Sequence, residues 1–131
     1  PARLAARLSG VIQAVLAESG LRPDVVSLHA AGIGAQDVAE RLALEAVLHA
    51  EGIETPTLRF KRAHGDLGAA AGPIEFLACS DALNRDILPP FVAEDLPGPR
   101  RPLRGALVIS LGLFGECALL MLERGNGNDA S

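Results

Sequence analysis

The stretch from Lys61 to Glu75 constrains the fold of this chain more than any other segment. It places a lysine, a histidine and an aspartate within six residues and then continues as a run of glycine and alanine up to Pro73. Such small residues let two backbones, or a backbone and a ligand, approach closely. Because proline is tolerated in a helix only in the first turn, the stretch predicts a site-like loop followed by a helix over 74–84.

Hydrophobic periodicity predicts how helices and strands alternate along the rest of the chain. The tetrapeptide at 112–115, Gly-Leu-Phe-Gly, lies between two apolar runs and predicts an antiparallel hairpin with a glycine-rich tip. The resulting αβαβαββ order is typical of a layered α/β domain with a largely parallel sheet and one antiparallel edge. The expected elements are helix 2–19, strand 25–29, helix 36–51, strand 55–60, helix 74–84, and strands 103–111 and 117–123. The side chains expected on the buried face of helix 36–51 are Val38, Leu42, Ala46 and Ala50.

Length and composition limit the classes of protein that the chain can belong to. Its 131 residues fit one domain, which we place at 1–124, with a disordered tail at 125–131. A net charge of −4 and scattered basic residues argue against nucleic-acid binding. The longest apolar run is far shorter than the roughly 20 residues of a membrane span. The chain has no recognisable signal peptide, and we expect a cytoplasmic protein.

The two cysteines, Cys79 and Cys117, match no zinc or redox motif in their spacing. We expect both to be reduced thiols in apolar surroundings, and we expect neither a metal nor a cofactor. The adjacent Arg100 and Arg101 are interpreted as a solvated basic pair, with contact to an acidic carrier protein as the alternative.

Each of three small-residue turns directly follows an expected strand. The turns cover 29–34, 61–72 and 112–115. In open α/β sheets, ligands bind at the carboxyl ends of the strands. The sequence therefore predicts that the three turns converge on one site.

The same three turns resemble the C-terminal half of the β-ketoacyl synthases, which have a thiolase-like fold. The resemblance covers almost the whole chain, from Pro1 to Arg124, and implies that half-fold here. The matching residues are His29 in the first turn, Lys61, Gly65, the run 70–72 and Glu75 in the second, and Ser110, Gly112 and Gly115 in the third.

Departures from the family pattern bear on activity. The second catalytic histidine of the family falls on Asp66, its pocket-gating phenylalanine on Leu113, and an asparagine that commonly follows the third motif on Cys117. Ala30-Ala31-Gly32 replaces the usual Gly-Thr-x-Thr. The pattern Gly32-x-x-x-x-Asp37-x-Ala39-Glu40 and the Gly72-Pro73 pair look most like chain-length factors, the non-catalytic partners of type II polyketide and polyene ketosynthases.

The family's chemistry explains why the change to Asp66 matters. These enzymes condense an acyl group, held on a cysteine of the N-terminal half, with malonyl on acyl carrier protein. Two imidazoles donate hydrogen bonds to the developing oxyanion. An ionised Asp66 would instead place negative charge there, and neither cysteine of this chain lies at a strand-to-helix elbow suited to a nucleophile.

The resemblance assigns family positions, with alternatives, to the polar residues of the turns. His29 is a catalytic remnant or a buried strand-end histidine, and Lys61 and Glu75 are an ion pair that braces the loop or active groups. Asp66 holds a catalytic position or caps the next helix. His64 replaces the missing imidazole or is a partly exposed loop residue. His49 is interpreted as a helix-surface residue. The residues implied as substrate-binding are Gly112, Leu113, Phe114 and Gly115.

A strand normally precedes the first helix in each half of a thiolase-like protein, and this chain shows none before residue 2. That strand lies in the middle of the family's sheet, so we expect unpaired backbone groups and exposed apolar helix faces without it. The chain is interpreted as a piece of a longer protein, or as a half-length subunit completed by a partner. In either case we expect that it does not exist alone as a monomer.

The leading hypothesis is a chain-length-factor-like, non-catalytic partner of a β-ketoacyl synthase, or the C-terminal part of one. It would shape the acyl tunnel in polyketide, polyene or fatty acid synthesis. The expected partners are a ketosynthase subunit in a heterodimer, or the N-terminal half, and acyl carrier protein. One alternative is an active ketosynthase half that uses His29 with His64 or Asp66. The other is a degenerate module that binds acyl chains or carrier protein.

Overall fold

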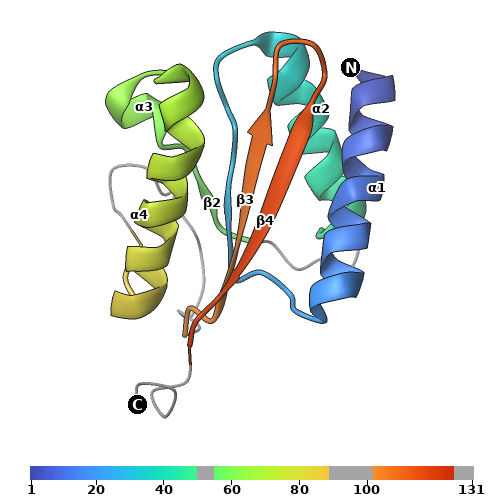
Figure 1. Ribbon diagram of the computed structural model, residues 1–131. Coiled ribbons are helices and arrows are strands. Elements are labelled where there is room, and N and C mark those ends of the chain that lie inside the picture. The colour runs from blue at the N-terminus through green and yellow to red at the C-terminus, as the bar shows by residue number, and fades with distance from the viewer. Residues whose placement is uncertain (50–54, 89–101, 126–131) are drawn as a thin grey trace.

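A four-stranded mixed sheet forms the middle layer of the protein in the computed structural model, which describes residues 1–49, 55–88 and 102–125 (Figure 1). The strand order is β2-β1-β3-β4, in which β1 runs parallel to both β2 and β3, and β3 is antiparallel to β4. This arrangement confirms the predicted α/β fold with an antiparallel hairpin at one edge. The strands are β1 (Val25–Ser27), β2 (Thr57–Leu58), β3 (Gly105–Leu111) and β4 (Cys117–Glu123).

Helices cover both faces of this sheet. The helices α1 (Ala2–Ser19) and α2 (Gly34–Val47) pack against each other on one face, and α4 (Ala71–Arg85) lies on the other (Figure 1). Between β2 and α4 the chain forms the short helix α3 (Lys61–His64) and the 3-10 turn η1 (Gly68–Ala70). None of the helices within the described ranges is both long and apolar enough to span a membrane.

Two aliphatic clusters fill the spaces between the layers. Alternate residues of β3 point to opposite faces, so Leu107 and Ile109 join the cluster under α1 and α2, while Ala106 and Val108 join the cluster under α4. The main partners in the first cluster are Leu8, Ile12, Val26 and Leu44, and those in the second are Leu58, Phe60, Cys79 and Leu83.

The predicted buried face of α2 was wrong. The helix ends at Val47, and Val38, Leu42 and Ala46 are exposed, while Ala50 lies outside the described residues. The helix carries two neighbouring stripes, and the stripe that faces the core contains two polar side chains whose hydrogen bonds lie inside the protein. Hydrophobicity alone therefore selects the wrong stripe. The buried residues are Gln36, Ala39, Glu40, Ala43 and Leu44.

The middle of the sheet also differs from expectation. Val25, Val26 and Ser27 of β1 pair directly with β3, so the described sheet has no gap and the expected unpaired backbone groups are not found there. The strands β1 and β2 are shorter than the predicted 25–29 and 55–60, because the chain turns toward Glu40 after Ser27 and into α3 after Phe60.

The start of α4 is close to the prediction, and two other predicted features lie outside the described residues. The helix predicted over 74–84 begins three residues earlier, at Ala71, so that Pro73 lies in its first turn as expected. The Arg100–Arg101 pair and residues 126–131 of the predicted tail lie outside the described residues.

Candidate functional site

The three small-residue turns meet at one end of the sheet. The turn at 29–34 follows β1, α3 follows β2, and the hairpin tip joins β3 to β4, and these connections lie at the upper end of the sheet in Figure 1. A hydrogen bond of 3.0 Å from Gln36 Nε2 to the carbonyl oxygen of Gly112 joins the beginning of α2 to the hairpin tip. The convergence follows from the parallel pairing, since parallel strands present their carboxyl ends at the same edge.

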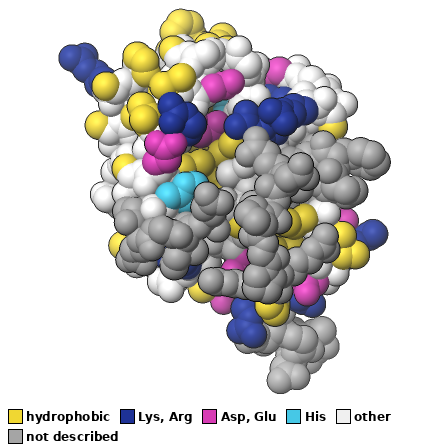
Figure 2. All heavy atoms as spheres, turned by 180° about the vertical axis from the view of Figure 1, so that it is seen from behind, with side chains coloured by type: hydrophobic (Ala, Val, Ile, Leu, Met, Phe, Trp, Pro, Cys, Tyr) yellow, Lys and Arg dark blue, Asp and Glu magenta, His cyan; other side chains and the backbone are white. Residues whose placement is uncertain are grey.

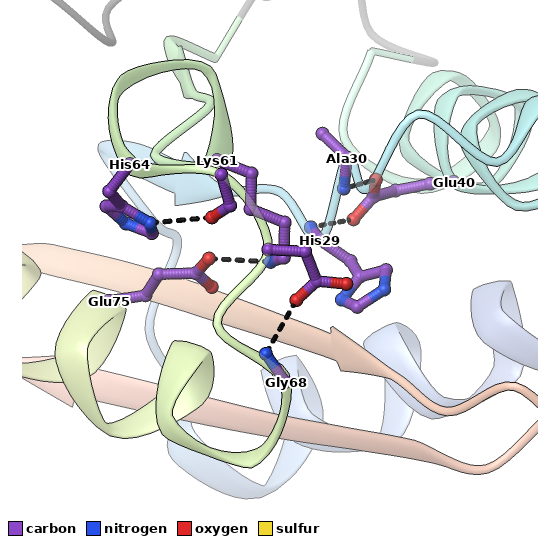
Figure 3. Close-up of polar contacts among 9 residues, drawn as sticks. His29, Ala30, Glu40, Lys61, His64, Gly68 and Glu75 are labelled. Atoms are coloured by element: carbon purple, nitrogen blue, oxygen red, sulfur yellow. Dashed lines mark hydrogen bonds and ion pairs between the residues drawn. The ribbon is translucent and has the colours of Figure 1, made fainter.

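A buried carboxylate holds the first turn. The backbone N–H of His29 donates to Glu40 Oε1 at 2.6 Å, and that of Ala30 donates to Oε2 at 3.1 Å (Figure 3). Ala30 has a φ of 38°, in the left-handed region that is uncommon for residues other than glycine. The glutamate thus fixes a turn that its own sequence does not favour.

Burial dominates the chemistry of Glu40. The side chain is 2% exposed, and desolvation raises its pKa to about 7, although the two backbone hydrogen bonds act in the opposite direction. The sequence placed Glu40 in a family pattern but did not predict its contacts. The available signal was the pair of polar residues Gln36 and Glu40, four positions apart among alanines.

Lys61 and Glu75 form a buried ion pair between the second turn and α4. Lys61 Nζ lies 2.6 Å from Glu75 Oε1, and the two side chains are 4% and 1% exposed (Figure 3). Burial raises the pKa of Glu75, and the hydrogen bond from Lys61 opposes this shift. A buried charge without its partner is strongly destabilising, so the pair fastens α3 to α4.

The imidazole of His29 lies beside this pair. Burial lowers the pKa of His29, Lys61 lowers it further, and the carboxylates of Asp66 and Asp37 raise it. Its Nδ1 atom is buried and has no hydrogen-bond partner within the described ranges. A neutral imidazole in this position can donate one hydrogen bond and accept another.

The other residues of the second turn do not complete a pair of imidazoles. His64 lies on the far side of the Lys61–Glu75 pair from His29, and its Nδ1 atom is 2.7 Å from the carbonyl oxygen of Gly65 (Figure 3). Asp66 Oδ1 accepts the backbone N–H of Gly68 at 3.0 Å. The carboxylate thus holds the 3-10 turn η1, whereas α4 begins without a side-chain cap.

His49 is not on a helix surface as predicted. It is partly buried just beyond the end of α2, and its Nε2 atom accepts the backbone N–H of Thr55 at 3.4 Å. It lines a cavity of about 150 Å³ beside α2, into which Asp37 and Glu40 also face. No group of three or more His, Cys, Asp or Glu side chains in the described part of the chain is placed to hold a metal ion.

The hairpin tip presents two apolar side chains on a braced backbone. Leu113 is 79% and Phe114 is 92% exposed. The backbone N–H of Phe114 donates to Glu116 Oε2 at 3.1 Å. A Cβ atom on Gly112 would lie 2.3 Å from the same oxygen, so the Glu116 side chain would have to move away to admit one. The tip is therefore built as a specific conformation.

An open hollow of about 390 Å³ lies between the base of this hairpin and η1. Gly68 and Ala69 form one wall, and Ser110, Cys117 and Ala118 are on the other. Small side chains on both sides leave the space. Cys79 lies elsewhere, on the buried side of α4. Burial raises the pKa of its thiol to about 12, so Cys79 is no candidate nucleophile.

Comparison with known proteins identifies relatives of the chain. Residues 1–94 match the family model described as "Beta-ketoacyl synthase, C-terminal domain". Two curated relatives carry the words "polyketide beta-ketoacyl synthase 2" in their names. The one from Streptomyces coelicolor is 35% identical over 90% of this chain and 31% of its own length, and the one from Streptomyces halstedii is 35% identical over 92% and 32%. The chain thus spans about a third of the length of these relatives. No solved structure gave a significant match.

Proposed function

The chain belongs to the β-ketoacyl synthase family, whose C-terminal domain it matches, and we propose that it acts there as a non-catalytic, chain-length-factor-like component. In this role it shapes the space for the growing acyl chain in polyketide synthesis, while a ketosynthase subunit or domain carries out the condensation. The 35% identity to two proteins whose names contain the words "polyketide beta-ketoacyl synthase 2" supports a role in polyketide synthesis.

The surroundings of His29 carry this proposal. Condensation by the family relies on two imidazoles that donate to one developing oxyanion. Here His29 is the imidazole beside the Lys61–Glu75 pair, and both Lys61 and the carboxylate of Asp66 act on it electrostatically from the second turn. The family position of the second imidazole is thus held by a carboxylate. Loss of one such donor lowers a rate by about 10²–10³, and a nearby negative charge repels the same oxyanion.

The contacts that position the three turns are present, although Asp66 stands where the family has its second imidazole. The ion pair, the glutamate that holds the first turn and the braced hairpin all keep the three turns in place. On the face shown in Figure 2, hydrophobic side chains gather at the upper end, where the turns meet. Ile33, Leu113 and Phe114 are among the exposed hydrophobic residues of these turns. This combination suits binding of an acyl chain without catalysis.

Exposed leucines on the α4 face of the sheet favour the binding of a protein partner there. Leu77 of α4 is 65% exposed and Leu120 of β4 is 52% exposed. Leu120 pairs with Val108, which packs in the cluster under α4, so both leucines belong to the same side of the sheet. Because the relatives are about three times as long as this chain, we propose that the ketosynthase subunit or N-terminal half covers this face. Acyl carrier protein is the proposed donor of the chain.

Replacement of His29 tests the proposal directly. The protein is reconstituted with its ketosynthase subunit, malonyl units and carrier protein, and condensation is followed by product formation. We expect His29→Ala to keep condensation within about threefold of wild type, and His49→Ala, a histidine outside the site, serves as the matched control. A loss of 10²–10³ in His29→Ala alone would establish the catalytic alternative.

The active-half alternative has one observation in its favour. Burial lowers the pKa of His29, which favours the neutral imidazole, and its buried Nδ1 atom has no hydrogen-bond partner among the described residues. Co-purification separates the remaining alternative. If the chain binds acyl groups but never associates with a ketosynthase, the degenerate binding module is correct and the chain-length-factor role fails.

A further inference from the structure

We propose that Gln36 is a positioning residue that fixes the hairpin tip and thereby sets the length of acyl chain that the site accepts. The tether itself follows from the contacts of the described residues. The effect on chain length rests on the proposed function.

Gln36 lies in the first turn of α2 and reaches across the fold. It is 8% exposed, and its Nε2 atom donates to the carbonyl oxygen of Gly112 at 3.0 Å. The other hydrogen bonds of the tip among the described residues are local, from Gly112 and Phe114 to Glu116 and from Gly115 to Gly112. Within the described residues, Gln36 therefore supplies the hydrogen bond that joins the tip to another element.

The same face of α2 holds the first turn as well. Glu40 lies one helical turn after Gln36 and accepts the backbone N–H groups of His29 and Ala30. Because the helix between them is rigid, α2 sets the spacing between the His29 turn and the hairpin tip. A change at Gln36 releases the tip and leaves the contacts of Glu40 in place.

The position of the tip determines the shape of the adjoining space. The base of the hairpin forms one wall of the hollow of about 390 Å³, and Leu113 and Phe114 project from its end. These two side chains are largely exposed, so the tethered backbone determines their position. The length of an acyl chain that contacts them is then limited by the position of that backbone.

The amide nitrogen is the part of Gln36 that acts. Its Oε1 atom is buried and has no partner among the described residues. Gln36→Met keeps the length of the side chain and removes the donor, so it deletes the tether with little change in packing. Gln13→Met makes the same exchange at an exposed position of α1 and is the matched control.

The experiment has two readouts on the protein assembled with its ketosynthase subunit. Hydrogen exchange of residues 112–116 reports on the tip, with the amides of β3 as the internal test that the variant is folded. We expect Gln36→Met to speed exchange at the tip by roughly threefold to tenfold, as expected for loss of one hydrogen bond, with β3 unchanged. We also expect the products to shift in length, and neither change in Gln13→Met.

Each other outcome is decisive. Unchanged exchange at the tip in a folded Gln36→Met protein overturns the tether. Faster exchange with an unchanged product distribution overturns the role in chain length. If the wild-type assembly makes no condensation product, the proposed function is what fails, and the exchange measurement still decides whether Gln36 positions the tip.

Discussion

Two buried carboxylates hold the end of the sheet at which the three turns meet, and their partners differ in charge. Glu75 is paired with the charged side chain of Lys61, whereas Glu40 accepts two neutral backbone N–H groups of a turn that contains a left-handed alanine. Burial raises the pKa of both, and for Glu40 it reaches about 7. A cation compensates a buried carboxylate in a way that two amides do not. The Lys61–Glu75 pair is therefore a fixed contact, whereas the contact of Glu40 with the first turn is sensitive to pH.

The largest test of this contrast is removal of Lys61. Lys61→Met leaves the carboxylate of Glu75 buried without its cation, which costs about 3–5 kcal/mol of unfolding free energy. The measurement is denaturant unfolding at pH 7. The double variant Lys61→Met/Glu75→Gln removes the stranded charge and should recover most of the loss. If the single variant loses less than about 1 kcal/mol, the pair is not the fastening described above.

Protonation of Glu40 gives the next largest effect. Its pKa in the folded protein is about 7, above the ordinary value of 4.5. Between pH 4.5 and pH 7 the folded state therefore keeps a proton on Glu40 that the unfolded state has released. Stability should therefore fall as the pH rises from about 5 to 7, by up to about 3 kcal/mol.

Unfolding measured at both pH values in wild type and Glu40→Gln isolates this contribution. His29, whose pKa is lowered, acts in the opposite sense in both proteins and cancels in the difference. Glu40→Gln should lose the dependence on pH. An equal slope in the two proteins would show that the Glu40 carboxyl does not titrate in this range.

The smallest expected effect concerns the strained turn that Glu40 holds. Ala30→Gly removes the Cβ atom from a residue at φ 38° and should raise the unfolding free energy by about 1 kcal/mol or less, because relief of strain is partly offset by the entropy of glycine. Ala31→Gly is the matched control, since the neighbouring residue is not in the left-handed region and should be destabilised or unchanged. A destabilised Ala30→Gly would mean that the turn is relaxed.

The sequence predicted what depends on local chemistry and on the order of elements. Pro73 and the small-residue run predicted the beginning of α4 to within three residues, and the strand-ending turns predicted the end of the sheet at which the three turns meet. The pairing of Lys61 with Glu75 came from the family resemblance and is present in the structure. These features depend on neighbours in sequence or on a known pattern.

Features that depend on tertiary packing were not predictable from the sequence. Gln36 and Glu40 face the core because their partners, Gly112 and the turn after β1, lie across the fold. Hydrophobicity therefore favoured the exposed Val38 and Leu42. The direct pairing of β1 with β3 was missed for a similar reason, since the expected sheet order came from the family and not from this chain.

The two tethers on α2 have a consequence for how this segment can change in evolution. Each residue inserted between Gln36 and Glu40 would rotate one side chain by about 100° relative to the other, and one loop would lose its anchor. The spacing of four is thus protected against insertions and deletions, whereas substitutions at the exposed Val38 or Leu42 leave it intact. Sequence variation in this helix should therefore consist of amino-acid substitutions and not of insertions or deletions.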